Sequence, residues 1–497
     1  MSSIHVSSRS TVSTIKSKVK SYSASALLLM GLALAVSIGY MVVTENWTIA
    51  VGLLFGLPVF ILLHKYPWLA VLIWVFLMPL FSVTPDFGGR QIYWIIHRAL
   101  PPATVVIMLV ASVLGINKRK FPKLGWPETA MVGYVVVSIL SIIALNDTPE
   151  ATFYKFYDRV ISPMFLYLII RLWSPNEADL KRLAPVVLYL LIIQIITGLV
   201  AWYSPHLLPS AWIDEERRTT GTVGSYGAYA ATMVFCGLFL LQSALNQKSG
   251  WVRVLYLIAF AVAGFGVFMS FSRGAWAAGT LVILGLIFID LKRIIQVALV
   301  VIPLVYVLAS GPLAGQVDWA SERLYSDRSE RSALVRLPVI QASIQMFLAK
   351  PFLGWGYENF NRYDWQFYQP VEGVTTPIKD ISSHNSYLTL LAEQGIVGAF
   401  LFLFPFFWWL VRSIRKARSL PAEGFWSVRS LILSWLFIFA YITINMFHNM
   451  RVVFGLCLWW VGLALIANAV DRLPEPEKSS VSSPASVYNK LGVRLLR

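Results

Sequence analysis

A single histidine closes the longest polar interval of this sequence. Residues 311–387 separate two apolar regions, and their last six residues read Ser-Ser-His-Asn-Ser-Tyr, which makes the histidine His384. A neutral imidazole can accept a proton from a hydroxyl group near neutral pH, so His384 is a candidate general base. The six histidines are scattered and show no metal-ligand spacing. They are His5, His64, His97, His206, His384 and His448.

Two arginines beside apolar segments, Arg218 and Arg273, form the second group that could do chemistry. A guanidinium group is planar, stays charged and donates two parallel hydrogen bonds to phosphate oxygens. A base can activate a hydroxyl group, and arginines can hold a diphosphate. The two functions combined would suit the transfer of a group from a lipid diphosphate to an alcohol. A structural interpretation competes: Arg273 could extend to lipid headgroups, and Arg218 could pair with neighbouring carboxylates. These carboxylates are Asp214, Glu215 and Glu216.

Several common site types are absent from the sequence. It has no Gly-x-x-x-x-Gly-Lys-Ser/Thr phosphate loop and no Gly-x-Ser-x-Gly nucleophile elbow. No paired carboxylates on the predicted external side would hold a divalent metal beside a phosphate. We therefore expect no metal and no cofactor. The two cysteines, Cys236 and Cys457, fall inside apolar runs and are predicted to be packed thiols.

Membrane spans are the elements that must position these residues. Of the 497 residues, 57% are hydrophobic and 13% are charged, and long apolar runs recur along nearly the whole chain. A transmembrane helix needs roughly 20 apolar residues to cross about 30 Å of hydrocarbon. The sequence therefore predicts an all-α polytopic membrane protein. The formal charge of +16 is attributed to basic residues that flank the spans, and no nucleic-acid partner is predicted.

About 14 spans (12–14) are predicted. They cover residues 24–43, 47–63, 67–83, 99–116, 128–145, 157–173, 183–203, 222–245, 254–272, 275–290, 294–310, 396–412, 427–446 and 451–470. The predicted organisation is a disordered cytoplasmic N-terminus at 1–22, transmembrane helices at 23–310, one large external loop at 311–395, transmembrane helices at 396–470 and a cytoplasmic tail at 471–497.

Basic residues indicate the orientation of the spans. If the N-terminus is cytoplasmic, alternate loops on that side carry basic clusters such as Lys-Arg-Lys at 118–120, whereas the opposite loops are poorer in basic residues. Both termini are thus predicted to be cytoplasmic, and Arg218, Arg273 and His384 external. Arginines on the external face are exceptions to the positive-inside rule. Binding an anion on that face would explain their presence.

The first part of the external loop predicts a helix from about Ser329 to Ala349, which Pro351 stops. Its apolar stripe is expected to lie against the membrane surface or the other helices. The stripe consists of Leu334, Leu337, Ile340, Ile344 and Phe347. Residues 357–369 are rich in aromatic and amide side chains, which suit stacking on sugar rings and equally suit the membrane interface.

The end of the loop predicts a short helix from His384 to about Gln394, capped by a serine at 382–383 and broken by Gly395. His384 would then lie in a first turn, whose dipole disfavours the imidazolium form. Glu393 lies on the opposite side of this helix from His384. A structural role is therefore expected for Glu393.

Five short motifs occur in the second half of the sequence. Residues 218–221 read Arg-Thr-Thr-Gly, 271–276 read Phe-Ser-Arg-Gly-Ala-Trp, 351–360 read Pro-x-x-Gly-x-Gly-x-x-x-Phe, 383–388 read Ser-His-Asn-Ser-Tyr-Leu, and 393–398 read Glu-x-Gly-Ile-Val-Gly. In their residues and their order they resemble motifs of the O-antigen ligase and polymerase superfamily. The resemblance covers about residues 215–415, and all of these motifs fall on the predicted external face.

This resemblance implies a metal-independent membrane glycosyltransferase, with an architecture similar to the GT-C type. By position, His384 would activate the acceptor hydroxyl, Arg218 and Arg273 would hold the diphosphate, and Arg331 would assist them. The donor would be an undecaprenyl-diphosphate-linked glycan and the acceptor a glycan or glycolipid. The protein would lie among the lipids of the bacterial cytoplasmic membrane, with its active site facing outward, and would act in surface polysaccharide biosynthesis.

The motifs leave three variants of this activity open, because each attacks an anomeric carbon with a hydroxyl group: ligase, polymerase and protein O-oligosaccharyltransferase. A second class of function is a non-enzymatic transporter or flippase for lipid-linked sugars. Transporters tend to show repeated halves with interrupted spans and charges near the midplane. This sequence has no such repeat and nearly uncharged mid-span regions, which favours the enzyme.

Overall fold

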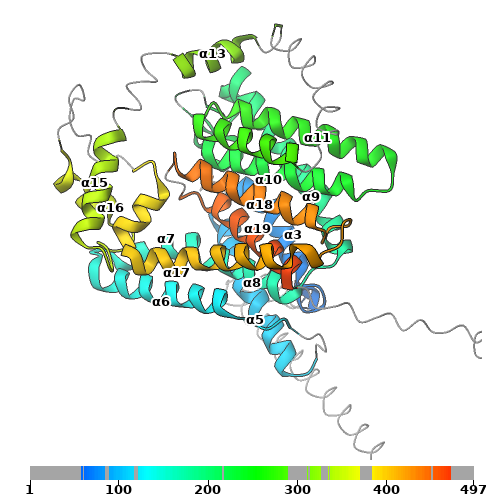
Figure 1. Ribbon diagram of the computed structural model, residues 1–497, viewed down its shortest axis with the longest axis horizontal. Coiled ribbons are helices and arrows are strands. Elements are labelled where there is room, and N and C mark those ends of the chain that lie inside the picture. Colours follow the sequence, from blue (N-terminus) through cyan, green and yellow to red (C-terminus); the bar gives the residue numbers. More distant parts are fainter. Residues whose placement is uncertain are drawn as a thin grey trace, which may run out of the picture. The chain divides into compact units, whose positions relative to one another are not determined.

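The computed structural model describes residues 58–59, 61–83, 89–116, 121–214, 216, 218–288, 310–311, 314–325, 334, 336–369, 383–448 and 451–471. The chain divides into two units, Met1–Leu69 and Ala70–Arg497, and the features described below lie in the second. Within the described residues all regular structure is helical, so the predicted all-α fold is confirmed (Figure 1).

Among the described residues, eight helices are long and apolar enough to cross a membrane. They are Gly89–Val113 (α4 Gly89–Tyr93, the π-helical turn η1 Trp94–Ala99 and α5 Leu100–Val113), α6 (Trp126–Leu145), α9 (Glu177–Tyr203), α10 (Tyr226–Leu245), α11 (Gly250–Met269), Ser386–Ser419 (mainly α17, Ser386–Lys416), α18 (Val428–Asn445) and α19 (Val453–Asp471). Shorter helices are α3 (Trp68–Phe81), α7 (Pro149–Phe156), the π-helical turn η2 (Tyr157–Ile161), α8 (Ser162–Trp173) and Arg273–Phe288.

These helices make the protein a polytopic membrane protein, as predicted. The predicted spans from residue 67 onward correspond to them, except 294–310, which lies outside the described residues, as do 24–43 and most of 47–63. The largest differences are at Gly89–Val113 and α9, which begin about ten and six residues before the predicted spans 99–116 and 183–203. The first arm of α17, before the bend at Gly395, corresponds to the short helix predicted at about 384–394. Asn176 caps α9, because its Oδ1 accepts the N–H of Asp179 at 2.9 Å.

α10 and α19 form the centre of the bundle. In each of them 89% of the most apolar stretch is buried. α10 packs against α9, α11 and α18, and α19 packs against α8, α17 and α18, while α6 runs beside α17 (Figure 1). A helix that is apolar on all sides is stable only when other helices or lipids surround it. Alanines and glycines on α10, such as Ala228, Ala231 and Gly237, allow close helix packing.

A buried ion cluster joins the helix ends farthest from the predicted site. The side chain of Arg171 on α8 is 1% exposed and pairs with Asp471 at the end of α19 at 2.8 Å. Arg171 also lies 3.5 Å from Glu128 on α6, and Arg412 on α17 pairs with Asp471 at 2.6 Å. The cluster fixes four helices at one end, which leaves the other end for the site.

α17 bends at Gly395, and the turn after α15 (Arg336–Ala349) docks onto the bend. Backbone hydrogen bonds of 2.8–3.2 Å join residues 351–356 to residues 392–397. Gly395 has a φ of 60° and a ψ of −168°, a conformation open mainly to glycine. A Cβ added to Gly354 or Gly395 would lie 2.4 Å or 2.3 Å from backbone atoms of the facing segment. The two glycines therefore permit backbone-to-backbone contact.

α15 ends at Ala349, as predicted, whereas residues 329–333 and 335 of the predicted helix lie outside the described residues. Its buried side chains are Val339, Ala342, Ser343 and Met346. The predicted stripe is not the face that packs on other helices, since Leu337 and Ile344 are 43% and 41% exposed, and its place against the membrane surface stays a prediction. Small side chains let α15 approach α17, which the periodicity of large apolar residues did not indicate. Two further helices of the loop, α13 (Ala314–Tyr325) and α16 (Phe360–Tyr363), were not predicted.

We predict that Gly395→Ala destabilises the protein more than a glycine substitution elsewhere. The new Cβ meets the backbone oxygen of Phe352, and the left-handed conformation alone costs about 1–3 kcal/mol for a residue other than glycine. A lower midpoint of thermal unfolding in detergent is the expected result. Gly250→Ala is the control, because no atom lies within 4 Å of a Cβ there. Equal midpoints for the two variants would contradict the docking of the turn on the bend.

Candidate functional site

The predicted site residues gather at one end of the helical bundle. α10, the Arg273–Phe288 helix and α17 begin there, and α18 ends there. The first turn of a helix has unpaired N–H groups and a partial positive charge. Three such helix starts, together with arginine side chains, make this end of the bundle favourable for an anion.

The turn before Arg273 is held by aromatic packing. Phe271 is 3% exposed, has a φ of 46° and packs against Trp202 and Phe268. A bulky residue in the left-handed region persists only when its surroundings hold it there. Ser272 follows, and its Oγ accepts the N–H of Ala275 at 3.4 Å. Arg273 is thus the first residue of its helix and has an exposed side chain.

Arg218 lies between α9 and α10 and is held by carboxylates. Its Nε and Nη2 donate to the two carboxylate oxygens of Asp214 at 3.0 Å each, and its Nη1 lies 3.4 Å from Glu216. Its guanidinium carbon lies 3.7 Å from the ring centroid of Tyr226. The structural interpretation of Arg218, an ion pair with these neighbours, is therefore observed, with Glu215 outside the described residues.

His384 lies just before α17 and not in its first turn, so the predicted start of this helix was wrong. Asn385 is the capping residue, because its Oδ1 accepts the N–H groups of Tyr387 and Leu388 at 3.0 and 3.1 Å. The Asn385 N–H in turn donates to Ser383 Oγ at 3.2 Å. His384 has a φ of 50°, a left-handed conformation that histidine adopts more readily than most residues. The sequence predicted Ser382 or Ser383 as the cap, and the possibility that Asn385 caps the helix was overlooked.

His448, in the loop between α18 and α19, is a site residue that the sequence analysis missed. Its Nε2 lies 2.8 Å from Ser272 Oγ, and its ring contacts Tyr226 edge-on with centroids 4.7 Å apart. Its carbonyl oxygen accepts the hydroxyl of Ser386 at 2.9 Å. Position alone could have indicated His448, since the loop it occupies was predicted to be external.

Arg336, the first residue of α15, also faces this group of residues. Burial lowers the pKa of Arg336, and the positive charges of Arg273 and Arg218 lower it further. Like charges near one another in a partly buried place are costly unless an anion offsets them. Arg331, the residue proposed from the resemblance, lies outside the described residues. The structure thus brings together His384, Arg218 and Arg273, and adds Arg336.

Both histidines of the site are uncharged at neutral pH. Burial lowers the pKa of His384 to about 4, with further contributions from the charges of Arg336 and Arg218. Burial lowers the pKa of His448 to about 3, and Arg336, His384 and Arg218 act in the same direction. A neutral imidazole next to arginines is available as a proton acceptor while the arginines remain charged.

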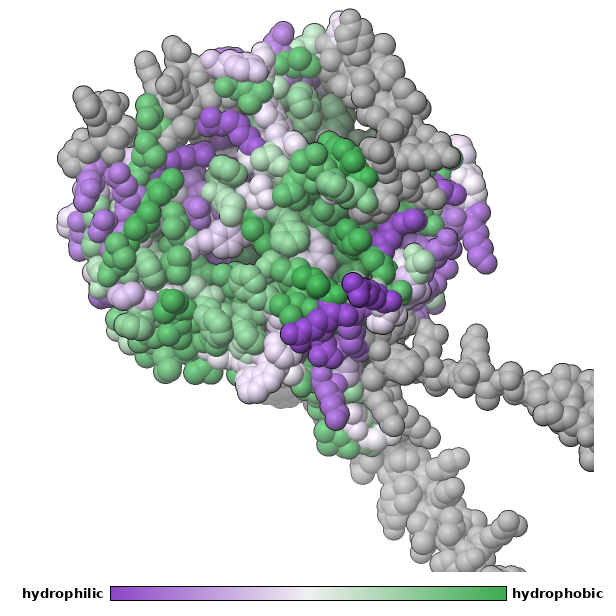
Figure 2. All heavy atoms as spheres, viewed as in Figure 1, coloured by the Kyte–Doolittle hydropathy of each residue, from purple (hydrophilic) through white to green (hydrophobic). Residues whose placement is uncertain are grey.

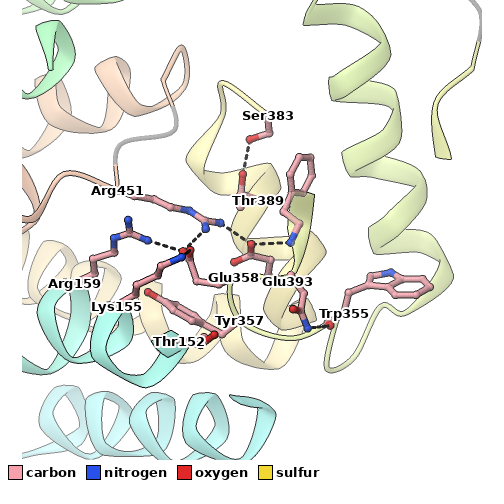
Figure 3. Close-up of polar contacts among 12 residues, drawn as sticks. Thr152, Lys155, Arg159, Trp355, Tyr357, Glu358, Ser383, Thr389, Glu393 and Arg451 are labelled. Atoms are coloured by element: carbon pink, nitrogen blue, oxygen red, sulfur yellow. Dashed lines mark hydrogen bonds and ion pairs between the residues drawn. The ribbon is translucent and has the colours of Figure 1, made fainter. Parts of the chain in front are cut away.

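A second polar cluster lies next to the site and joins the docked turn to the loop before α19 (Figure 3). Arg451 pairs with Glu358 and also with Glu393, the latter at 2.5 Å, and Arg159 pairs with Glu358 at 2.6 Å. Burial raises the pKa of Glu358, but the neighbouring arginines lower it more, so the carboxylate is charged. Glu393 also accepts the N–H of Phe360 at 3.1 Å. These contacts are consistent with the structural role expected for Glu393.

A cavity of about 390 Å³ lies between α6, α17, α18 and α19, beside the site. Most of its lining is apolar or aromatic, including Tyr134, Leu390, Phe402, Phe439 and Trp459. Its few polar groups include Ser386, whose hydroxyl also bonds His448. Figure 2 shows a largely hydrophobic face that is hollowed near the level of α17 and α18. Such a lining suits a hydrocarbon chain better than a sugar.

The helices define a polytopic membrane protein, and its arginines and neutral histidines cluster at one end of the bundle. Residues 257–403, which include Arg273, Arg336 and His384, match the family described as O-Antigen ligase. A Salmonella typhimurium protein named O-antigen ligase is 21% identical to the chain over 306 residues, which are 59% of this chain and 73% of that protein. Both similarities agree with the resemblance of the motifs to the O-antigen ligase and polymerase superfamily.

We predict that Arg451→Met destabilises the protein by about 3 kcal/mol, since removing one partner of a buried ion pair leaves an uncompensated charge. In this variant both Glu358 and Glu393 lose their shared partner. Thermal and denaturant unfolding in detergent would measure the loss. Arg362→Met is the matched control: Arg362 pairs with Asp147 at 2.7 Å, but both side chains are exposed, so less than about 1 kcal/mol is expected. Similar losses in the two variants would contradict the burial of the Arg451 cluster.

Proposed function

We propose that this protein is a membrane glycosyltransferase that transfers lipid-diphosphate-linked glycan to a hydroxyl group. Its similarity to the O-Antigen ligase family and to the Salmonella typhimurium O-antigen ligase supports a role in joining glycans. The observation that carries the proposal is the neutral imidazole of His384 beside Arg218 and Arg336. A base and an anion site side by side are the two components that this transfer needs.

The arginines act on the donor. Arg273 and Arg336 donate hydrogen bonds to the diphosphate oxygens, while Arg218, whose donors are occupied by Asp214, contributes its charge. As the glycosidic bond to the diphosphate breaks, negative charge grows on the departing oxygen. Preorganised positive groups stabilise that charge more than they stabilise the ground state. Three guanidinium groups and three helix starts can do this without a metal ion.

His384 acts on the acceptor. Its neutral ring takes the proton of the acceptor hydroxyl while the oxygen forms a bond with the anomeric carbon of the donor. The bond between that carbon and the diphosphate oxygen breaks in the same transfer, and the lipid diphosphate leaves. The acceptor hydroxyl therefore has to lie within hydrogen-bond reach of His384, on the side of the sugar opposite the arginines.

The cavity beside the site offers room for the hydrocarbon part of the donor. Its lining is mostly apolar and includes Ser386 and Asn445, which supports a chain end close to the arginines. We assign undecaprenyl diphosphate as the carrier, a glycan or glycolipid as the acceptor, and the outer face of the bacterial cytoplasmic membrane as the place of reaction. Both termini are then cytoplasmic.

We predict that purified protein, given undecaprenyl-diphosphate-linked glycan and an acceptor, releases undecaprenyl diphosphate and enlarges the acceptor. His384→Ala and Arg273→Ala should lower the rate at least about a hundredfold, because a general base contributes roughly 10²–10⁴ and one electrostatic donor roughly 10²–10³. Arg362→Ala, an arginine of the same loop outside the site, should stay near wild type. Product size on gels distinguishes a polymerase, which makes a ladder, from a ligase, which makes one addition.

Two results would contradict this function. Properly folded His384→Ala and Arg273→Ala proteins that still convert the donor at the wild-type rate would rule out the assigned site. Movement of the donor across vesicle membranes without any new glycosidic bond would show a transporter instead.

We predict that kcat/KM of the wild type stays high from pH 7 to about pH 5 and falls as pH drops through about 4. The neutral form of His384 is the active one, and its pKa is lowered to about 4. Arg336→Gln removes one of the charges that lower this pKa, so the acid limb should move to higher pH even though the overall rate falls. Unfolding measured at each pH is the control. An acid limb that stays in place in Arg336→Gln would show that the two residues do not face each other.

A further inference from the structure

His448 takes no part in the function proposed above, yet it contacts the segments that carry or adjoin Arg273, Arg218 and His384. Its side chain is nearly buried, with 9% exposed. It comes from the loop between α18 and α19, far in sequence from the other site residues. Its ring therefore lies between segments that are far apart in the sequence.

The first contact of His448 reaches the Arg273 turn. His448 Nε2 lies 2.8 Å from Ser272 Oγ. Because Ser272 Oγ accepts the N–H of Ala275, its own hydrogen is available for a hydrogen bond to Nε2. The serine is thus both the cap of the Arg273 helix and the partner of the histidine. A shift of the ring would shift the cap.

The other contacts reach the segments of Arg218 and His384. The ring meets Tyr226 edge-on, and Tyr226 lies under the guanidinium group of Arg218. A Cβ added to Gly227 would lie 3.2 Å from the ring, so the ring packs tightly against α10 at this glycine. On the third side the carbonyl oxygen of His448 accepts the hydroxyl of Ser386, two residues after His384.

We propose that His448 is a positioning residue that sets the separation of the Arg273 turn and the His384 turn, so that the bound diphosphate and the acceptor hydroxyl meet. This role rests on the proposed function. The ring acts through Ser272 and Ser386, and it does not itself take the acceptor proton, because its Nε2 is engaged and its side chain is nearly buried.

The test compares His448→Ala, His448→Gln and Ser272→Ala with the wild type in two measurements. Calorimetry with inorganic pyrophosphate reports the anion site alone, and the transfer assay gives kcat and KM for the donor. His448→Ala and Ser272→Ala should each weaken pyrophosphate binding about tenfold, the size of one lost hydrogen bond. His448→Gln should stay within about threefold, since its amide can still bond the Ser272 hydroxyl. His206→Ala, an exposed histidine after α9, is the control and should match the wild type.

A double-mutant cycle separates positioning from a general loss of stability. If His448 acts through Arg273, then His448→Ala should weaken pyrophosphate binding little further in an Arg273→Ala background. The acid limb of kcat/KM should remain at the wild-type pH in His448→Gln, because His384 is still the base. The expected kinetic pattern is a raised KM together with a lowered kcat in His448→Ala, and recovery of both in His448→Gln.

Several outcomes would overturn the proposal. Additive effects of His448→Ala and Arg273→Ala, or wild-type binding and turnover in His448→Ala, would show that the ring positions nothing. A His448→Gln protein that binds pyrophosphate normally but is as inactive as His448→Ala would show that His448 is itself a base. Wild type that binds no pyrophosphate would remove the anion site and this role with it. Coupled pyrophosphate binding without any glycan transfer would instead uphold the positioning role and refute the proposed function.

Discussion

Close contact between two backbone segments determines how this site is built. Residues 351–356 lie directly on the bend of α17, and only glycine fits at Gly354 and Gly395. The bend separates the first arm of α17 from the rest of the helix, so the arm starts at the site while the longer part follows the bundle. The cap at Asn385 and the turn at His384 take their place from this arm. The docked turn also brings Glu358 next to Arg451, which ties the arm to the loop before α19.

Burial gives the two kinds of side chain in the site opposite properties. Removal from water lowers the pKa of an imidazole far enough to leave it neutral, whereas a guanidinium group keeps its charge because its ordinary pKa is so much higher. The arginines then lower the pKa of the histidines further. In the proposed function, one arrangement therefore supplies a proton acceptor and an anion site together, and His448 joins the turns that carry them.

The apolar pattern of the sequence predicted most of the fold, because a membrane span has to satisfy its backbone within itself and to expose apolar side chains. It failed where packing or capping decides: Gly89–Val113 and α9 start before their predicted spans, Asn385 and not a serine caps α17, and α15 packs its small residues inward. For the site, motif order indicated His384, Arg218 and Arg273. Neither Arg336 nor His448 has a local signal that separates it from the other arginines and histidines of the chain.

The sequence by itself determined the class of protein, the helices and the end of the bundle to which the site residues belong, since hydrophobicity and alternation of spans are properties of single segments. Only the tertiary structure decided which side chains meet. Contacts such as those from Ser272 to His448 and from Arg451 to Glu393 join residues 176 and 58 positions apart. They depend on how helices pack and where α17 bends, and no local pattern of residues encodes either.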